Sequence, residues 1–219
     1  MKNTIALVTG GFTGESVVSF KSAGFVETQI DQSKYEVYKI IILKDSWYYE
    51  DINAVKHPVD KNDFTITLNG QKIRFDAAFI MLHGSPGEDG RLQGYFDMLG
   101  IPYTSCDALT SSITMNKGYS KAIVNGIKDL HVARSIQLFE NSAIASADLL
   151  ASLELPLFIK PNNGGSSIGM SKVKQADELP EALNKAFKED TQVLVEEFIQ
   201  GREFSIGVYN TRNGIKVLP

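Results

Sequence analysis

Short apolar runs separated by glycine-rich turns organise the first hundred residues of the chain. Residues 5–8, 35–43 and 77–82 are runs of aliphatic and β-branched side chains, which are typical of buried strands. The turn 10–14 follows the first run, and the positions after it predict a helix over residues 15–26. Strands and helices therefore alternate from the start of the chain.

Two further patterns complete this first part. Residues 64–68 and 72–75 alternate apolar and polar side chains on both sides of Asn69-Gly70, which predicts a β-hairpin insertion. A second helix is expected between Asp89 as its N-cap and Gly100 as its end. Its apolar face has the spacing i, i+3, i+4, i+7, formed by Leu92, Tyr95, Phe96 and Leu99. The order of elements predicts an open α/β domain of Rossmann type that ends near residue 105.

The pattern changes after residue 105. Residues 107–127 predict one helix, with an apolar face formed by Tyr119, Ala122, Ile123 and Ile127. Short strands are expected at 132–138, 157–160, 169–173, 192–197 and 203–209, helices near 146–153 and 176–188, and a hairpin turn at 212–215. Two helices among several antiparallel-type strands predict a separate α+β module.

Composition narrows the class of protein. Of 219 residues, 43% are hydrophobic and 22% are charged, which describes a soluble globular protein. The formal net charge of −4 without a basic block argues against a nucleic-acid partner. The first apolar run ends after four residues, too short for a signal or membrane segment. Cys106 is the only cysteine, so no intrachain disulfide forms, and we expect a cytoplasmic protein without a membrane partner.

A lysine at the end of a predicted strand precedes a loop of small residues. Lys160 follows an apolar run, and residues 161–169 read Pro-Asn-Asn-Gly-Gly-Ser-Ser-Ile-Gly. Glycines let backbone N–H groups approach anionic oxygens, while Lys160, Ser166 and Ser167 supply charge and donors, so a phosphate chain suits this loop. The lysine precedes the glycines, unlike the order in a P-loop. A glycine-rich surface turn beside an exposed lysine is the alternative.

Glu15 and His83 follow predicted strands of the first domain. Ligands of open α/β sheets bind at the carboxyl ends of the strands, where both residues lie. A carboxylate there suits a substrate ammonium, and a histidine suits a carboxylate. Glu15 could equally match the helix dipole, and His83 could be an ordinary loop histidine. His57 and His131 lack such a context and are interpreted as structural.

Acidic residues follow the predicted strand 192–197. Glu196 and Glu197 end this strand and Glu203 comes shortly after it. They could bind a metal ion or accept hydrogen bonds from ribose and adenine, and the second use needs no further ligands. Lys117 lies near a helix start, where a cation is unfavourable without a nearby anion, which favours a phosphate role.

With these segments placed, the chain resembles the D-alanine–D-alanine ligases of the ATP-grasp superfamily. The string His-Gly-x-x-Gly-Glu-Asp-Gly is specific to these ligases, whereas Lys-Pro before a Gly/Ser loop is shared more widely across ATP-grasp enzymes. The resemblance runs through nearly the whole chain, carried by Gly10-Gly11 with Glu15, Val18 and Ser19; Leu82-His83-Gly84 with Gly87-Glu88-Asp89-Gly90; Leu92-Gln93-Gly94; Gly100-Ile101-Pro102-Tyr103-Thr104; Met115-Asn116-Lys117; Ile159-Lys160-Pro161; the segment 165–173; and Val195-Glu196-Glu197 with Glu203-Phe204.

The resemblance implies a fold and a reaction. It implies a Rossmann-like substrate-binding domain over residues 1–105, the central α+β domain of an ATP-grasp fold over 106–196, and the start of a catalytic domain over 197–219. The carboxylate of one D-alanine would attack the γ-phosphate of ATP to give an acyl phosphate. The amine of a second D-alanine would displace phosphate, giving the dipeptide used for peptidoglycan, the cell wall and cell shape.

Matching positions imply residue roles. Glu15 would hold the first ammonium, His83 would lie beside its carboxylate, and Ser166, with Ser167 in the closing loop, would link toward Glu15. Lys117 and Lys160 would bind ATP phosphates. The adenine and ribose would meet Glu196, the backbone of Glu197 and Ile199, and Glu203.

The resemblance also implies partners and leaves alternatives. It implies Mg²⁺ or Mn²⁺, whose ligands we expect beyond residue 219 together with an arginine for the transition state, and a homodimer. Thr13 stands where many relatives have serine, and Asn162-Asn163-Gly164 replaces a more charged loop start. A ligase joining D-alanine to D-lactate or D-serine, and an inert nucleotide-binding fragment, remain alternatives. A dinucleotide-dependent oxidoreductase lacks its G-x-G-x-x-G spacing here.

Overall fold

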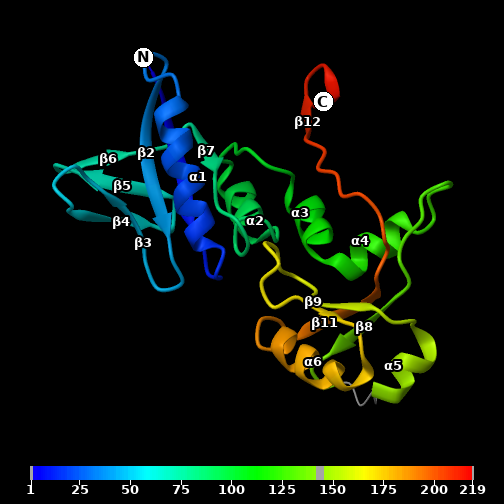
Figure 1. The fold of residues 1–219 in the computed structure, drawn as a ribbon. Helices are drawn as coiled ribbons and strands as arrows, with labels where there is room; N and C mark the ends of the chain where they lie inside the picture. The colour runs from blue at the N-terminus through cyan, green and yellow to red at the C-terminus, as the bar shows by residue number, and fades with distance from the viewer. Residues whose placement is uncertain (1, 142–145, 219) are drawn as a thin grey trace.

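A computed structural model describes residues 2–141 and 146–218 of the chain. Its regular elements form two lobes joined by two helices, with a short hairpin near the C-terminus (Figure 1). The first lobe contains a seven-stranded sheet in the order β6-β5-β4-β3-β2-β1-β7, and the second a four-stranded sheet in the order β10-β9-β11-β8. The fold is therefore mixed α/β, as the sequence predicts.

The first sheet is parallel at one end and antiparallel at the other. β1 pairs in parallel with β2 and β7, and the remaining strands continue the sheet as antiparallel neighbours. Its elements are β1 (Asn3–Gly10), α1 (Ser16–Gln29), β2 (Tyr35–Ile42), β3 (Trp47–Glu50), β4 (Lys56–Asp60), β5 (Thr65–Leu68), β6 (Gln71–Ile73), β7 (Ala77–Ile80) and α2 (Arg91–Leu99). Aliphatic and aromatic side chains of β2, β4 and β5 pack with Phe64, Leu92 and Phe96 to form its core.

The structure confirms much of the predicted first lobe and corrects two points. The expected hairpin is present, with Leu68 opposite Gln71 and positive φ angles at Asn69 and Gly70. It is not a lone insertion, because β3 and β4, which the sequence analysis missed, connect it to β2. The predicted N-cap Asp89 is wrong: Gly90 caps α2, with a left-handed backbone that suits glycine.

Two helices join the lobes, in place of the single helix expected over 107–127. The break lies at Asn116, which ends one helix and caps the next by accepting a hydrogen bond from the Tyr119 N–H. The elements are α3 (Ala108–Met115), α4 (Lys117–Val124), β8 (Ser135–Phe139), α5 (Ser146–Ser152), β9 (Leu157–Pro161), β10 (Ser171–Val173), a short 3₁₀ turn (Ala176–Glu178), α6 (Leu179–Phe187) and β11 (Gln192–Glu197).

Alternation along β9 and β11 gives the second sheet a buried face and an open face. Leu157, Ile159, Val193 and Val195 form a core with Leu179 and other residues of α5 and α6. The intervening side chains of β9 point to the opposite face, which α4 approaches (Figure 1). Lys160 and Glu196, two of the nucleotide-binding residues predicted from the sequence, lie on this open face.

The end of the chain differs from its prediction. Residues 198–207 have no regular strand, so the strand expected at 203–209 is wrong. A two-stranded hairpin follows instead, formed by β12 (Val208–Thr211) and β13 (Gly214–Val217), with the turn expected at 212–215. The domain boundaries at 105 and 196 stay a prediction. Within residues 2–141 and 146–218, no helix is both long and apolar enough to cross a membrane.

Gly10 provides a test of how β1 ends. Its φ is +107°, and a Cβ added there would overlap the backbone oxygen of Ile42 on the neighbouring strand. We expect Gly10→Ala to lower the free energy of unfolding by about 3 kcal/mol, because strain and a backbone clash combine. Gly70→Ala is the matched control, since Gly70 also has a positive φ but no atom near its added Cβ.

The comparison is made by urea denaturation monitored by circular dichroism. The control is expected to lose about 1 kcal/mol, the cost of a positive φ alone. Equal losses in the two variants would show that the close approach of β1 and β2 at Gly10 does not matter.

Candidate functional site

The carboxyl ends of β1 and β7 bring Glu15 and the segment after His83 together. β1 and β7 are parallel neighbours, and α1 starts directly after Glu15. The Glu15 side chain is buried at 5% exposure, and a Cβ on Gly84 would lie 2.7 Å from its Oε2. Glycine at position 84 therefore leaves room for the carboxylate that the sequence analysis singled out.

His83 is held against helix α1. Its backbone N–H donates to the Ser19 Oγ at 2.9 Å, and its Nε2 lies 3.1 Å from the Ser22 Oγ. Ser19 therefore fixes the backbone of His83, and Ser22 holds its ring. The sequence analysis missed the contact with Ser22, which the helical spacing from Ser19 could have suggested. The Nε2 of His57, which was interpreted as structural, lies within hydrogen-bonding distance of the Asp51 Oδ2, at 2.9 Å, in the antiparallel part of the sheet.

The loop after β9 reaches the first lobe at Glu15. The Ser166 Oγ donates to the Glu15 Oε1 at 3.0 Å, so the expected link between these residues is present. A Cβ on Gly165 would lie 2.6 Å from the same oxygen, so only a residue without a side chain lets the loop come this close. Ser166 and Ser167 have φ angles of +51° and +58°, a strained conformation for serine. Strain of this kind is characteristic of ligand-binding loops.

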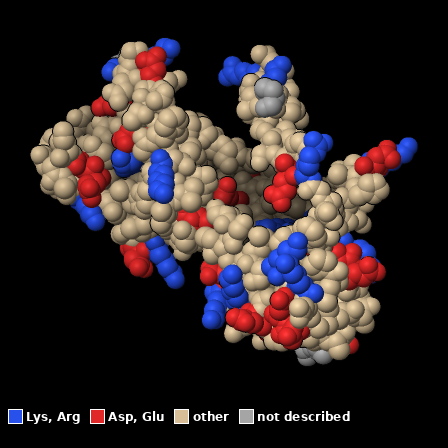
Figure 2. All heavy atoms as spheres, in the orientation of Figure 1, with Lys and Arg blue, Asp and Glu red and all other residues tan. Residues whose placement is uncertain are grey.

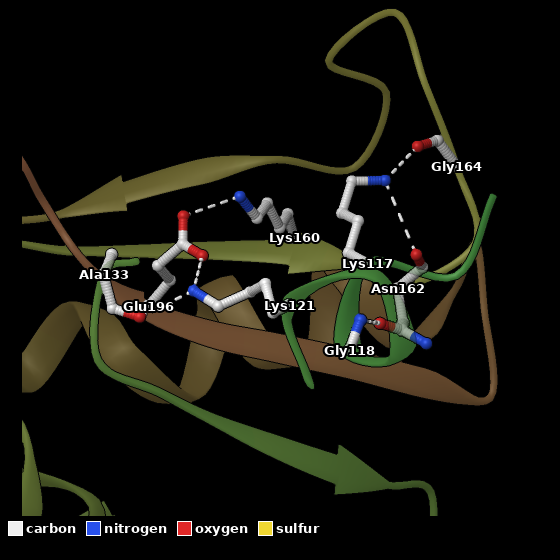
Figure 3. Close-up of polar contacts among 8 residues, drawn as sticks. All are labelled: Lys117, Gly118, Lys121, Ala133, Lys160, Asn162, Gly164 and Glu196. Atoms are coloured by element: carbon white, nitrogen blue, oxygen red, sulfur yellow. Dashed lines mark hydrogen bonds and ion pairs between the residues drawn. The ribbon is translucent and has the colours of Figure 1, made fainter. Parts of the chain in front are cut away.

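Lys117 is anchored to the same loop. As the first residue of α4 it donates from its Nζ to the Gly164 carbonyl oxygen, and its Nζ lies 3.5 Å from the Asn162 carbonyl oxygen. Burial, followed by the charge of Lys160, lowers the pKa of Lys117. In Figure 3 the Lys117 side chain points to the loop, away from Glu196. A cation that is partly desolvated and held by carbonyls only is suited to receive an anion.

Lys160 and Glu196 pair on the open face. Lys160 lies opposite Leu194 on β11, which makes Glu196 its diagonal neighbour, and the Lys160 Nζ to Glu196 Oε1 distance is 2.8 Å. The second carboxylate oxygen of Glu196 accepts from Lys121, a residue that the sequence analysis missed. Burial opposes the ionisation of Glu196, but hydrogen bonds from Lys121 and Lys160 outweigh it and lower the pKa of Glu196.

The remaining residues predicted for the adenine and ribose are Glu197, Ile199 and Glu203. The Glu197 Oε1 accepts from the Glu154 N–H at 2.9 Å and forms an ion pair with Arg134 at 3.3 Å. Ile199 is 63% exposed, and Glu203 is exposed in the irregular segment 198–207. The structure therefore joins Lys160 to Glu196 and Ser166 to Glu15, and it places Lys117 near enough to Lys160 for their charges to interact. Within the described residues, no hydrogen bond or ion pair joins Ile199 or Glu203 to these groups.

Asn162 is a buried residue that joins the site elements. It is 0% exposed; its Oδ1 accepts from the Gly118 N–H at 2.9 Å and its Nδ2 donates to the Gln192 Oε1 at 3.0 Å. Its backbone carbonyl oxygen accepts from the Lys117 N–H at 3.1 Å. Asn162 therefore fixes the start of α4, and with it Lys117, to the end of β9.

Cavities surround this arrangement. A cavity of about 440 Å³ lies between the lobes, bordered by residues of both such as Thr13, Arg91 and Asn163. Another of about 360 Å³ borders α4 and β8, with Lys121 and Gln137 in its wall. Figure 2 shows a hollow between the lobes with charged side chains at its border. No group of three His, Cys, Asp or Glu side chains able to hold a metal ion occurs among residues 2–141 and 146–218.

Known proteins resemble both lobes. Residues 4–106 match the family model described as D-ala D-ala ligase N-terminus, and residues 127–219 match D-ala D-ala ligase C-terminus. The D-alanine--D-alanine ligase of Flavobacterium johnsoniae is 42% identical over 100% of this chain, and that of Parabacteroides distasonis is 43% identical. The chain spans 67% and 66% of these relatives, respectively.

Solved structures give the same result. D-alanyl-alanine synthetase A from Vibrio cholerae superposes on this chain with a TM-score of 0.87 at 27% sequence identity. The aligned region covers 99% of this chain and 65% of the Vibrio cholerae chain. The VanG D-Ala:D-Ser ligase from Enterococcus faecalis superposes with a TM-score of 0.84 at 33% sequence identity, and the aligned region covers 99% of this chain and 68% of the VanG chain.

Asn162→Ala tests whether this buried amide holds the site together. The substitution leaves the partly buried Gly118 N–H without its side-chain acceptor and removes one of the two donors to the Gln192 Oε1, which keeps the Gln137 amide. We therefore expect a loss of roughly 2–3 kcal/mol in the free energy of unfolding. Asn213→Ala, at an exposed turn position, is the control and is expected to change stability by less than about 0.5 kcal/mol. A stability of Asn162→Ala equal to that of the control in chemical denaturation would remove Asn162 from this role.

Proposed function

Because the chain belongs to the D-alanine–D-alanine ligase family, we propose that it serves in the ATP-dependent joining of two D-alanines for bacterial peptidoglycan. The observation that carries this proposal is the convergence of Lys117 and Lys160 beside a strained Gly/Ser loop that contacts Glu15. The loop thus connects two lysines suited to an anion with a carboxylate suited to an ammonium. The chain spans about two thirds of its relatives, so the activity is proposed for the protein with all its ligase segments.

We assign the first lobe to the first D-alanine. Glu15 supplies the countercharge for its ammonium, and His83 lies beside its carboxylate. That carboxylate oxygen attacks the γ-phosphorus of ATP, and the bond from phosphorus to the bridging oxygen breaks, giving an acyl phosphate and ADP. The amine of the second D-alanine attacks the acyl carbon, loses a proton, and phosphate leaves with the carbon–oxygen electron pair.

We assign the open face of the second sheet to ATP. Lys117 and Lys160 bind phosphate oxygens, Ser166 and Ser167 close over them, and Glu196, the backbone of Glu197 and Ile199, and Glu203 meet adenine and ribose. Fixed cations around a transferring phosphoryl group stabilise its charge in the transition state, which is the main contribution that a protein makes to this chemistry. The arrangement of Lys117 and Lys160 supports the phosphate part of this assignment more directly than the exposure of Ile199 and Glu203 supports the remainder.

Phosphoryl transfer of this kind also uses Mg²⁺, or Mn²⁺ in its place. Glu196 is engaged by two lysines and Glu197 by Arg134, while Glu203 is exposed in an irregular segment. These acidic residues, and the rest of the described chain, do not fit a magnesium site by themselves. We therefore expect the 219-residue chain alone to bind ATP only weakly and to make no dipeptide.

A crossed pair of variants tests the assignments. The chain is joined after Pro219 to the remaining third of the Flavobacterium johnsoniae relative, and dipeptide and phosphate are measured with ATP, Mg²⁺ and D-alanine. Lys160→Ala is expected to raise the KM for ATP about tenfold or more, because a charge-assisted contact is lost. Glu15→Gln is expected to weaken use of the first D-alanine by a similar factor and to leave the KM for ATP within about twofold.

The outcomes are separable. Phosphate release without dipeptide, or dipeptide from the 219-residue chain alone, would contradict the proposal. If Glu15→Gln changed only the ATP term, the first-substrate site would be wrong. D-serine and D-lactate are offered in parallel as second substrates, because the 33% identity to a D-Ala:D-Ser ligase favours that second candidate reaction. A product that joins D-alanine to D-serine would establish the second candidate reaction, and a product that joins D-alanine to D-lactate would establish a D-lactate ligase.

We propose a cytoplasmic homodimer. The exposed free thiol of Cys106 suits a reducing compartment, where ATP is available. Helix α1 buries only Ser19 and Ala23, and its apolar side chains Val17, Phe20 and Phe25 are exposed. An uncovered apolar face of this kind is typical of a surface that a second copy covers.

Sedimentation equilibrium tests the dimer. Phe25→Glu is expected to shift the protein from dimer to monomer, because it places a charge in the proposed contact. Met98→Glu is the control, since Met98 is also exposed and apolar but lies on α2. A wild-type chain that sediments as a monomer would rule out this assembly.

A further inference from the structure

Lys121 is a charged residue of the open face that the proposed function leaves without a role. It lies one helical turn after Lys117 on α4, so both side chains emerge on the same side of the helix. The Lys117 ammonium points to the loop after β9, but the Lys121 ammonium does not. Figure 3 shows it directed to Glu196, beside the carbonyl group of Ala133.

The carboxylate of Glu196 is divided between two lysines. Its Oε1 accepts from the Lys160 Nζ at 2.8 Å, and its Oε2 accepts from the Lys121 Nζ. Exposed fractions are 18% for the side chain of Lys121, 16% for Glu196 and 22% for Lys160, so the three groups are largely withdrawn from water. Each lysine therefore approaches a different oxygen, and neither blocks the other.

The two lysines are held differently. Lys121 has a second acceptor, the Ala133 carbonyl oxygen at 2.7 Å, which anchors its ammonium whatever Lys160 does. Among the described residues, the ammonium of Lys160 has Glu196 as its single hydrogen-bonding partner. Lys160 can therefore leave Glu196 by rotating its side chain, whereas Lys121 is held by two acceptors.

This difference matters when a phosphate arrives. A phosphate oxygen that binds Lys160 must compete with the Glu196 carboxylate for the same ammonium. A largely buried carboxylate left without a partner is costly, so a lone Lys160–Glu196 pair would resist the exchange. A second fixed cation on Glu196 removes this cost, because the carboxylate keeps one partner throughout.

We propose that Lys121 is a positioning residue for nucleotide binding: it holds the Glu196 carboxylate in place and charged, so that Lys160 is free to turn to a phosphate oxygen. The proposal rests on the proposed function for the identity of the anion. If Lys121 only braced α4 against β11, removing it would not change how easily Lys160 leaves Glu196 for a phosphate oxygen.

The experiment measures ATP binding to the 219-residue chain by titration followed with NMR, which detects weak binding. Lys121→Met is expected to weaken ATP binding about tenfold, and Lys121→Arg, which keeps the charge, by less than about threefold. In the background of Glu196→Gln, Lys121→Met is expected to weaken ATP binding by less than about threefold, because a neutral side chain no longer traps Lys160. Lys128→Met, at an exposed lysine, is the control and is expected to bind ATP as the wild type does.

A pH series provides a readout that bracing alone does not move. The charged groups facing Glu196 are Lys121 of α4 and Lys160 of β9; Lys117 adds its charge from α4, and β8 contributes only the neutral Ser135. With Lys121 removed, burial is opposed by one lysine only, so the pKa of Glu196 rises. Protonation then releases Lys160, and the affinity of Lys121→Met relative to wild type is expected to improve from about pH 8 to about pH 5.

The carboxyl carbon signal of Glu196 is titrated in the same samples without nucleotide. Its midpoint is expected to be higher in Lys121→Met and unchanged in Lys121→Arg. Unchanged ATP affinity together with an unchanged midpoint would overturn the proposal, and so would a loss from Lys121→Met that is as large in the Glu196→Gln background as in the wild type. If ATP moves no signal in any variant, the proposed nucleotide site fails, while the Glu196 titration still decides whether Lys121 holds the carboxylate.

Discussion

Positive charge gathered on one sheet face is the constraint around which the second lobe is arranged. Lys117, Lys121 and Lys160 approach the open face from α4 and β9, and like charges that are partly withdrawn from water repel one another. Glu196 relieves two of them, and backbone carbonyls of the loop after β9 hold the third. The remaining positive potential is directed at the space between the sheet, α4 and the loop, which is what an anionic ligand requires.

The same loop connects this charge to the first lobe. Ser166 reaches Glu15 across more than one hundred residues of sequence, and Gly165 and Gly84 provide the space that the buried carboxylate needs. Asn162, at the beginning of the loop, fixes the start of α4 by two hydrogen bonds to consecutive residues of that helix. Ordering the loop and placing Lys117 are therefore one structural event, which couples the anion side of the site to the carboxylate side.

Local sequence signals accounted for the elements that stand by themselves. The Asn69-Gly70 turn and the buried run of β1 are determined by a few adjacent residues, and both were predicted. β3 and β4 were missed because their side chains are mainly polar or aromatic, and Pro58 lies within β4. The break between α3 and α4 was missed because the apolar spacing from Tyr119 to Ile127 gives no sign of it, whereas the Asn116 side chain begins a new helix by accepting from the Tyr119 N–H.

The candidate site shows the same limit. Lys117, Lys160, Ser166 and Glu15 were found because each lies in a motif, whereas Lys121 and Asn162 act through partners far away in sequence. Glu196 lies 75 residues from Lys121, and no local pattern announces that pairing. The alternation along β11 places Glu196 and Glu197 on opposite faces, but the sequence analysis treated the two acids together and did not separate them.

The central claim is that the open face of the second sheet is the nucleotide site. Chemical-shift mapping of the isotope-labelled 219-residue chain with ATP tests it most directly. The account predicts that the largest shifts occur at Lys117, Lys160 and the loop 162–169, while signals of α6 on the opposite face stay unchanged. Shifts confined to the first lobe, or to α6, would contradict it.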